Sequence, residues 1–324
     1  MKKNGHPYPP IKHIDLTNSM TLNQLVLQFG RSGVMSAGKI ARAVDTAQKM
    51  FQDSECRVFL GVAGAMVPGG MKHVLLDLLK TGKIHVLVTT GAMLTHDLVE
   101  ALGHCHMKGT SHIDDRELHK QNLVRMYDSF MSSSVYEHME EFLAPHFEEL
   151  SQQPTIKDFL WRLGEKIPIH QSILRLCSER KIPLFCPALA DSGIGLMVWG
   201  QLARGKKCSI PAFDDLKEIL QLAWNAKKCG VWYIGGGVPK NFIQQAMQFA
   251  PKGASYGIQI TTDRPEWGGS SGAELREGIS WGKMVYDANH VDVPLDATVA
   301  LPLIVGALKE RLWGKEQPKS ESVK

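Results

Sequence analysis

A lysine beside a large aromatic residue is the feature of this sequence best suited to chemistry. Trp281 and Lys283 stand two residues apart, shortly after a glycine-rich run over residues 267–272. Glycines let a ligand approach the backbone closely, and desolvation against an apolar wall disfavours the charged form of an amine. An amine in that state can attack an imine or carbonyl carbon at neutral pH. The sequence therefore indicates Lys283 as a candidate nucleophile, with an ordinary surface lysine after a turn as the alternative.

Loops rich in glycine and small residues follow four predicted strands. They span residues 61–70, 89–92, 187–193 and 235–237. Such turns expose N–H groups at helix N-termini, where phosphate binds, although each alone is also ordinary turn chemistry. Together on one sheet edge they favour a dinucleotide or similar ligand. Asp191 and Asp296 are assigned to its ribose or adenine, with a helix cap or Asx turn as the alternative for each.

Two other chemistries have weaker support. His96, Glu100 and His104 are spaced to share one helix face, which is a possible zinc site. Gly103 weakens that helix where the last ligand would sit, and a solvated polar face explains the spacing equally well. We therefore predict no metal. A serine hydrolase is also disfavoured, because the sequence has no GxSxG elbow.

The elements that position these residues alternate between short apolar runs and helical patterns. Apolar runs of strand length lie at 57–62, 84–90, 182–186, 230–234 and 254–260. Helices are predicted at 20–52 with breaks at Gly30 and Gly33, at 71–80, from Asp97 onward, at 212–228 and at 240–249. The polar middle, from 106 to about 166, is predicted to be helical. The alternation predicts an α/β fold whose parallel sheet is covered by helices on both faces, with the strand ends that bind ligands along one edge.

The predicted organisation is a single domain over residues 21–314. Prolines at positions 7, 9 and 10 predict an extended arm over residues 1–20. Residues 315–324 are expected to form a frayed tail.

Composition excludes several classes of protein. The 324 residues are 44% hydrophobic and 22% charged, as in globular proteins. Their net charge of +4 is scattered, which argues against nucleic acid as a partner. We find no apolar run of the roughly 20 residues that cross a membrane, and no secretory signal pattern. Six cysteines without a CxxC pair indicate reduced thiols. The predicted location is cytoplasmic.

A set of motifs between Phe59 and Leu308 resembles deoxyhypusine synthase. The motifs lie at residues 86–90, 187–191, 235–240, 271–273, 280–283 and 296–297, and their order and spacing are specific as a set. The resemblance implies a Rossmann-like parallel sheet and a homotetramer with sites at a dimer interface. It also implies an NAD-dependent aminobutyl transfer. NAD takes a hydride from spermidine to give an imine, and a lysine captures the four-carbon unit. That unit then passes to an acceptor amine and is reduced by the same NADH.

The resemblance also assigns roles to residues of this chain. Lys283 corresponds to the family's imine-forming lysine, and Glu277 and Trp281 to substrate-site residues. An indole face can hold an ammonium, and a carboxylate can pair with an amine. The residues assigned to NAD are Thr90, Gly91, Asp191, Gly235, Gly236, Gly237, Ser271, Asp296 and Ala297.

Several positions depart from the family pattern. Thr95 and His96 stand where the family has adjacent glutamates, and Asn241 stands where it has a base-like histidine. Further departures are Gly64-Ala65 for a Ser-Asn pair, and Leu196 and Trp267 for aspartates. Because most of the lost groups are acids, the predicted pocket is less anionic, and we assign His96 and Asn241 to its substrate side. The pattern resembles the deoxyhypusine synthase-like branch known mainly from bacteria, which lack the translation factor that the true enzyme modifies.

Three functions follow. The leading one is an NAD-linked alkyl-amine transferase that acts through a Lys283 imine on small polyamines, for example in homospermidine-type transfer to putrescine. The second is a true deoxyhypusine synthase that modifies a protein lysine. The third is a non-catalytic NAD-binding relative, although such a binder would need neither Lys283 nor Trp281.

Overall fold

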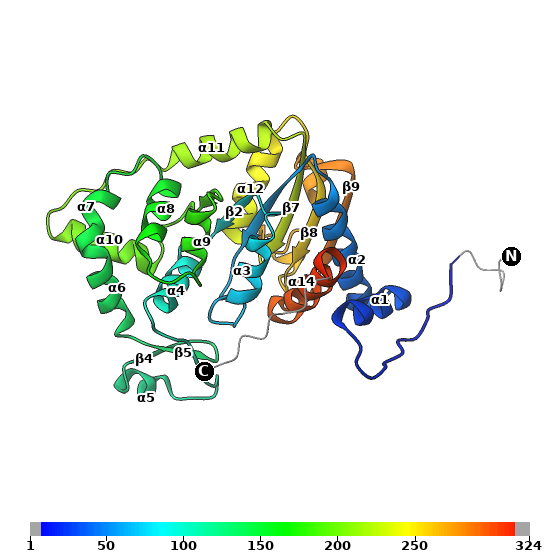
Figure 1. The fold of residues 1–324 in the computed structure, drawn as a ribbon, viewed down its shortest axis with the longest axis horizontal. Helices are drawn as coiled ribbons and strands as arrows, with labels where there is room; N and C mark the ends of the chain where they lie inside the picture. Colours follow the sequence, from blue (N-terminus) through cyan, green and yellow to red (C-terminus); the bar gives the residue numbers. More distant parts are fainter. Residues whose placement is uncertain (1–7, 315–324) are drawn as a thin grey trace.

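A six-stranded parallel sheet forms the centre of the computed structural model, which describes residues 8–314 (Figure 1). Its strand order is β6-β2-β1-β7-β8-β9. The strands are β1 (Cys56–Val62), β2 (Val86–Thr89), β6 (Leu184–Phe185), β7 (Lys228–Ile234), β8 (Ala254–Ile260) and β9 (Met284–Val293). The predicted α/β fold with a parallel sheet is confirmed.

The sheet is buried on both faces because its strands carry apolar side chains in both directions. Trp232 and Ile234 of β7 belong to one core, and Val231 to the other. Helices α2 (Met35–Gln52), α3 (Lys72–Lys80) and α14 (Ala297–Trp313) cover the first core, and α11 (Phe213–Trp224) and α12 (Gly237–Phe249) cover the second. Figure 1 shows the sheet between these two groups. Two apolar faces explain why the strands appear in the sequence as continuous apolar runs.

The first helix shows how local sequence sets helix ends. Helix α1 (Leu22–Ser32) begins at Thr21, which forms a capping box with Gln24, and ends at Gly33 with a left-handed φ of 70°. The predicted break at Gly33 is therefore confirmed. The predicted break at Gly30 is wrong, because α1 runs through that residue.

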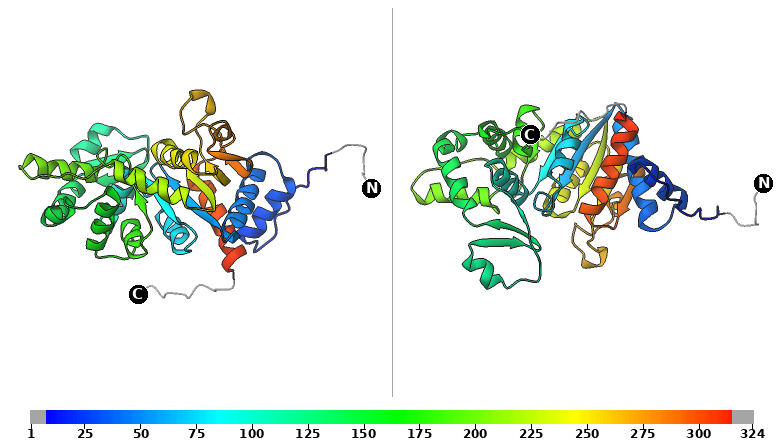
Figure 2. Two further views of the ribbon diagram at one scale, coloured as in Figure 1. Left: turned by 90° about the horizontal axis from the view of Figure 1, so that it is seen from above. Right: turned by 60° about the horizontal axis from the view of Figure 1, so that its bottom comes forward.

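The middle of the chain contains a small sheet that the sequence did not predict. Strands β3 (Met107–Lys108), β5 (Ser129–Ser132) and β4 (Leu123–Met126) form it in antiparallel order. It projects from the molecule beside α5 (Asp115–Lys120), as the right-hand view of Figure 2 shows. These strands have two to four residues each and no clear apolar alternation, so the prediction of helix alone failed.

Helices make up most of the remainder of this region. They are α6 (Val135–Leu143), η1 (Ala144–His146), α7 (Phe147–Leu150), α8 (Ile156–Lys166), α9 (Ile173–Glu179) and α10 (Gly193–Ala203). In the C-terminal part, η2 (Pro265–Trp267) and α13 (Glu277–Ser280) lie between β8 and β9.

Two helix boundaries and one strand also differ from the prediction. Helix α4 (Gly91–Ala101) starts at Gly91 rather than near Asp97, because Thr90 caps it. Helix α11 ends at Trp224, since Lys228 already begins β7. Strand β9 was missed, because exposed polar residues such as Asp287 interrupt its apolar pattern.

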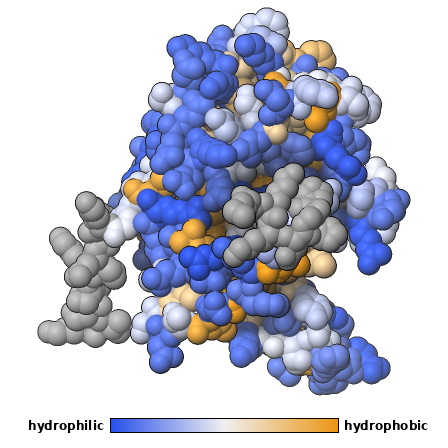
Figure 3. All heavy atoms as spheres, turned by 90° about the vertical axis from the view of Figure 1, so that its right-hand side faces the viewer, coloured by the Kyte–Doolittle hydropathy of each residue, from blue (hydrophilic) through white to orange (hydrophobic). Residues whose placement is uncertain are grey.

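Residues 8–20 precede the first helix and carry no helix or strand. The predicted tail, residues 315–324, lies outside the described residues, so the proposed domain limits stay a prediction. Within the described part, no helix is both long and apolar enough to cross a membrane. The face shown in Figure 3 is mainly hydrophilic, with small separate apolar areas.

Candidate active site

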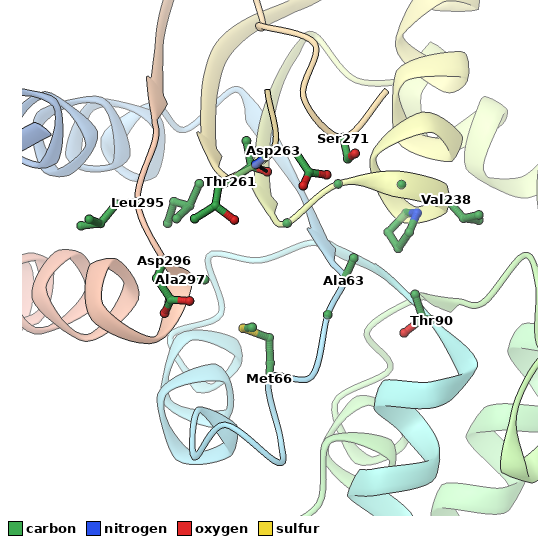
Figure 4. Close-up of a pocket in the computed structure, with 17 residues that line it drawn as sticks. Ala63, Met66, Thr90, Val238, Thr261, Asp263, Ser271, Leu295, Asp296 and Ala297 are labelled. Carbon is green, nitrogen blue, oxygen red and sulfur yellow. Dashed lines mark hydrogen bonds between the residues drawn. The ribbon is translucent and has the colours of Figure 1, made fainter. Parts of the chain in front are cut away.

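The sheet topology creates a crevice between β1 and β7. From β1 the chain adds β2 and β6 on one side, then returns to add β7, β8 and β9 on the other. Connections that leave two adjacent parallel strands in opposite directions open a crevice outside their carboxyl ends. A cavity of about 430 Å³ lies at this point (Figure 4).

Loops after five strands line this cavity. Figure 4 shows Thr90 and Val238 on one side of it, Leu295 and Asp296 on the other, and Ser271 above. The lining residues are Ala63, Gly64 and Met66 after β1, Thr90 after β2, Gly235 to Pro239 after β7, Ile260 to Asp263 and Ser271 after β8, and Leu295 to Ala297 after β9.

Three helices begin at the cavity. Thr90 caps α4 by accepting a hydrogen bond from the Met93 amide at 3.3 Å, and Asp296 caps α14 by accepting one from the Thr298 amide at 2.8 Å. Helix α12 begins after Gly236, which offers no side-chain cap. The first N–H groups of α12 therefore remain available to a ligand. Because helix N-termini carry partial positive charge, this end of the cavity suits an anionic group such as a pyrophosphate.

Gly236 brings two loops into close contact. A Cβ on this residue would lie 2.3 Å from the Ser271 Cα atom, so only glycine fits here. The turn after β7 and the 268–274 segment thus pack directly against each other beside the cavity.

A second cavity, of about 160 Å³, contains the candidate nucleophile. The Lys283 Nζ atom lies 4.8 Å from the centroid of the Trp281 ring, within cation–π range. The lining residues are Asn241, Gln244, Gly268, Gly269, Ser270, Ala273, Glu274, Glu277, Gly278, Trp281 and Lys283. Helix α12 and the 268–274 segment contribute residues to both cavities, so the two cavities are neighbours on either side of the same elements.

The acids of the second cavity differ in their partners. Glu274 forms an ion pair with Arg276, with 2.5 Å between Oε2 and Nε. Glu277 has no ion pair with any residue between 8 and 314. A carboxylate without a cationic partner is available to bind a substrate ammonium.

Lys240 of α12 precedes the lining residue Asn241 and is buried, with an exposed fraction of 1%. Its Nζ atom donates a hydrogen bond to the Ala273 carbonyl at 2.6 Å, and Gln259 Nε2 donates to the same oxygen at 3.0 Å. Burial lowers the pKa of Lys240 to about 8. The sequence reasoning included this lysine in a motif but gave it no role. The available signal was its place one turn before the buried residues Ile243 and Gln244.

Most of the predicted site residues come together in these two cavities. Those assigned to a nucleotide that line the first cavity are Thr90, Gly235, Gly236, Gly237, Ser271, Asp296 and Ala297. Lys283 lines the second cavity together with Glu277, Trp281 and Asn241. Gly91 is buried behind Thr90 and packs against Ser192. Asp191 is exposed and lines neither cavity.

His96 also lies outside both cavities. Its Nδ1 atom is 2.9 Å from His106 Nε2, and His106 Nδ1 is 2.8 Å from Glu100 Oε1. Burial lowers the pKa of His96 to about 4. The considered helix face of His96, Glu100 and His104 does not form, because α4 ends at Ala101 and His104 stacks on His138 instead.

Residues after β8 were missed as part of the site. Thr261, Thr262 and Asp263 line the first cavity. Strand β8 was predicted to end at Ile260. That end implies a fifth loop at the same edge of the sheet. This loop has no glycine immediately after the strand, so it lacks the glycine-rich pattern that marks the other four loops.

Comparison with known sequences gives a consistent family. A family model described as deoxyhypusine synthase matches residues 24–308. A protein of Methanosarcina acetivorans named "Probable deoxyhypusine synthase 1" is 41% identical over 304 residues, which cover 94% of this chain and 95% of that protein. One of the same name from Archaeoglobus fulgidus is 40% identical over 297 residues, covering 92% and 97%.

Solved structures show the same fold. A candidate deoxyhypusine synthase of Entamoeba histolytica superimposes with a TM-score of 0.61 at 19% identity, over 92% of this chain and 96% of the other. A ternary complex of AgrE with ornithine and NAD⁺ superimposes with a TM-score of 0.53 at 10% identity, over 86% of this chain and 34% of the other. At these identities the likeness concerns the fold alone.

Proposed function

The chain belongs to the deoxyhypusine synthase family of transferases, and we propose that it is an NAD-dependent alkyl-amine transferase that acts through an imine on Lys283. The observation that carries this is the placement of Lys283, Trp281 and Glu277 in one cavity, next to a larger cavity at the topological switch point.

The larger cavity fits a dinucleotide. The uncapped N-terminus of α12 provides N–H groups for a pyrophosphate, and Asp263 and Asp296 provide acceptors for ribose hydroxyls. Bound there, NAD would supply a hydride acceptor for the carbon next to a substrate amine and a hydride donor for the later reduction. The assignment of Asp191 and Gly91 to the cofactor stays a prediction.

Lys283 captures the oxidised substrate. Its amine attacks the imine carbon and forms a new C–N bond, and the bond from that carbon to the departing amine breaks. The alkyl unit is then held as an imine on Lys283 until an acceptor amine displaces it by the same exchange. Trp281 shields one side of the lysine and offers its ring to a cationic substrate.

The charges of the second cavity favour a small amine. Glu277 is the acid there that lacks an ion pair with a described residue, and Asn241 is neutral. One such carboxylate pairs with one distal ammonium, as in a short diamine or polyamine arm. His96 has no place in this cavity, so its assigned contact with substrate stays a prediction.

A protein lysine is the second candidate acceptor. It is favoured by the names of the archaeal relatives, which are 40–41% identical to this chain over most of its length. The assignment of this chain to the deoxyhypusine synthase-like branch known mainly from bacteria stays a prediction. A non-catalytic NAD binder is disfavoured, since Lys283 and Trp281 are both kept.

We also propose that the chain forms a homotetramer. An exposed apolar groove of about 500 Å³ on α10 supports this part. Leu196 and Trp199 in this groove are 53% and 65% exposed, and exposed apolar patches of this kind mark interaction surfaces. Light scattering of the purified protein measures the assembly directly. The predicted cytoplasmic location is retained as a proposal.

Trapping of the imine tests the function. The protein is incubated with NAD and spermidine, putrescine or another polyamine, then reduced with borohydride, and its intact mass is measured. We expect a mass increase in the wild type and none in Lys283→Ala, while NAD binding is retained. Lys252→Ala, at an exposed lysine before β8, is the matched control and keeps the adduct.

The acceptor is identified in the same assay. The acceptor is added before the borohydride, while the unit is still an imine: loss of the adduct with putrescine supports a small-molecule acceptor, whereas loss only with a protein lysine supports true deoxyhypusine synthase activity. NAD binding without an adduct from any amine contradicts the transferase proposal.

A further inference from the structure

Lys240 differs from the other buried lysines of residues 8–314. Lys72, Lys157 and Lys240 are 6%, 7% and 1% exposed. Lys72 lies 3.7 Å from Asp97 and 3.1 Å from Glu100, and Lys157 is likewise close to two carboxylates. Within the same part of the chain, Lys240 has no carboxylate within 4.0 Å and one hydrogen-bond acceptor, the Ala273 carbonyl. A buried ammonium without a counterion is costly, so the neutral amine is favoured.

The sheet below Lys240 is polar but poorly paired. Tyr233, Gln259 and Asp292 are aligned in register across β7, β8 and β9, so their side chains share one face. The Tyr233 hydroxyl and Gln259 Oε1 are buried and have no hydrogen-bond partner in the described chain. Lys240 Nζ lies 6.0 Å from the Tyr233 ring centroid. We call Lys240 and these three residues the amine row.

The charged groups around Lys240 act in both directions on its pKa. The pKa is lowered to about 8: burial lowers it most, the charges of Asp292 and Glu277 raise it, and the positive charge of Lys283 lowers it. Asp292, whose own pKa burial raises, is held by the Leu275 amide at 3.1 Å. A group with a pKa near the working pH is well suited to accept a proton and return it.

Lys240 adjoins the cavity that contains Lys283 through two residues. Its hydrogen-bond acceptor, Ala273, and its chain neighbour, Asn241, both line the cavity that contains Lys283. The Asn241 amide cannot take a proton at neutral pH. The Lys240 amine can accept a proton, and its hydrogen bond to Ala273 joins it to a residue that lines this cavity.

We propose that Lys240 accepts the proton that Lys283 must lose before it attacks the substrate imine. The Lys283 ammonium gives one proton to the Lys240 amine, and the free Lys283 amine forms its bond to the imine carbon. The bond from that carbon to the departing amine breaks, with its electron pair on the departing nitrogen. That nitrogen takes the proton back from Lys240, so protons balance and no electron is transferred. The step rests on the proposed function of Lys283.

Replacing Lys240 with arginine separates this role from a structural one. Lys240→Arg keeps the positive charge and a donor for the Ala273 carbonyl but cannot accept a proton. The measurement is the single-turnover rate of borohydride-trapped adduct with NAD and spermidine, between pH 6.5 and 9.5. We expect a fall of about 100-fold at pH 7.5, unchanged affinity for NAD, and loss of the rise in rate near pH 8 that the wild type shows. Lys157→Arg is the matched control and keeps the wild-type profile.

Thermal unfolding tests the titration of Lys240 without substrate. The unfolded chain holds this proton up to about pH 10.4 and the folded chain only to about pH 8, so folding is favoured as pH rises between these values. The melting temperature of the wild type relative to Lys240→Met must therefore increase across this window. A constant difference overturns the proposal. So does an adduct that forms in Lys240→Arg at the wild-type rate and with the wild-type pH profile. Absence of adduct in the wild type instead ends the proposed function, and this step with it.

Discussion

Two buried polar regions of this protein are paired in opposite ways. The first, which we call the ionic chain, joins Lys72, Asp97, Glu100, His106 and His96. In it Asp97 also accepts hydrogen bonds from the Ser172 hydroxyl at 2.7 Å and the Ile173 and Leu174 amides, both at 3.0 Å. Among residues 8–314, the amine row leaves two oxygens without a hydrogen-bond partner and gives the Lys240 amine a single acceptor.

This difference in hydrogen-bond pairing indicates that the ionic chain has a structural role and the amine row a chemical one. A fully paired network fixes elements relative to one another, and the ionic chain joins α3 and α4 to the start of α9. An underpaired polar group destabilises the fold and persists where it has another role. The ionic chain lies outside both cavities, whereas Lys240 of the amine row is hydrogen-bonded to Ala273, which lines the cavity of Lys283. We therefore expect substitutions in the first region to affect stability, and those in the second to affect turnover.

Asp97→Ala is the most severe test of the paired region. The change leaves the Ser172 hydroxyl and two α9 amides without their buried acceptor, and it leaves Lys72 with Glu100 as its one carboxylate partner in the described part of the chain. We expect the free energy of unfolding to fall by about 3–5 kcal/mol, measured by urea denaturation. Asp77→Ala, at an exposed ion pair with Lys309, is the control and should lose less than about 1 kcal/mol. A loss that small for Asp97→Ala contradicts the structural role of the ionic chain.

His96→Gln tests the acid dependence of the same region. The pKa of His96 is about 4 in the folded chain and about 6.5 when unfolded, so the unfolded chain binds more protons between these values. The stability contributed by neutral His96 is complete above about pH 6.5 and is lost as pH falls to about 4. In the wild type, His96 lowers the free energy of unfolding by at most about 3 kcal/mol as pH falls from about 6.5 to about 4. We expect this contribution to be absent in His96→Gln. The readout is denaturant unfolding at several pH values.

The control for this experiment is His112→Gln, at an exposed histidine. Its unfolding curves should follow those of the wild type at every pH. If His96→Gln also follows the wild type, burial does not hold His96 neutral.

Lys240→Met should have the smallest effect on stability at pH 7. Methionine fills a similar volume, and removal of a buried amine without a counterion relieves a desolvation cost. We expect a free energy of unfolding within about 1 kcal/mol of the wild type. Lys157→Met, the matched change, should lose more, because Asp158 and Glu218 keep their charges without their lysine. An equal loss in the two variants would place Lys240 among the structural lysines.

The sequence was sufficient for the features that depend on local pattern. Apolar runs located β1, β2, β7 and β8, because both faces of this sheet are buried. The parallel arrangement then placed Thr90, Gly236 and Asp296 at one edge, although they are far apart in the chain. Strand β9 and the small antiparallel sheet lack such a pattern and were missed.

Features that depend on tertiary contacts could not be predicted from the sequence. The spacing of His96 and Glu100 on α4 predicted one shared face, but their partner is His106, which comes after the helix ends. The isolation of Lys240 from carboxylates is likewise a property of the packed sheet and has no trace in the residues adjacent to it.

The contact between Gly236 and Ser271 constrains how this protein can diversify. The 268–274 segment lines both cavities, so a change there alters the two cavities together. Asn241 and Gln244 face the smaller cavity alone. New substrate preferences are therefore most readily acquired at these two positions, where selection can act on one ligand without loss of the other.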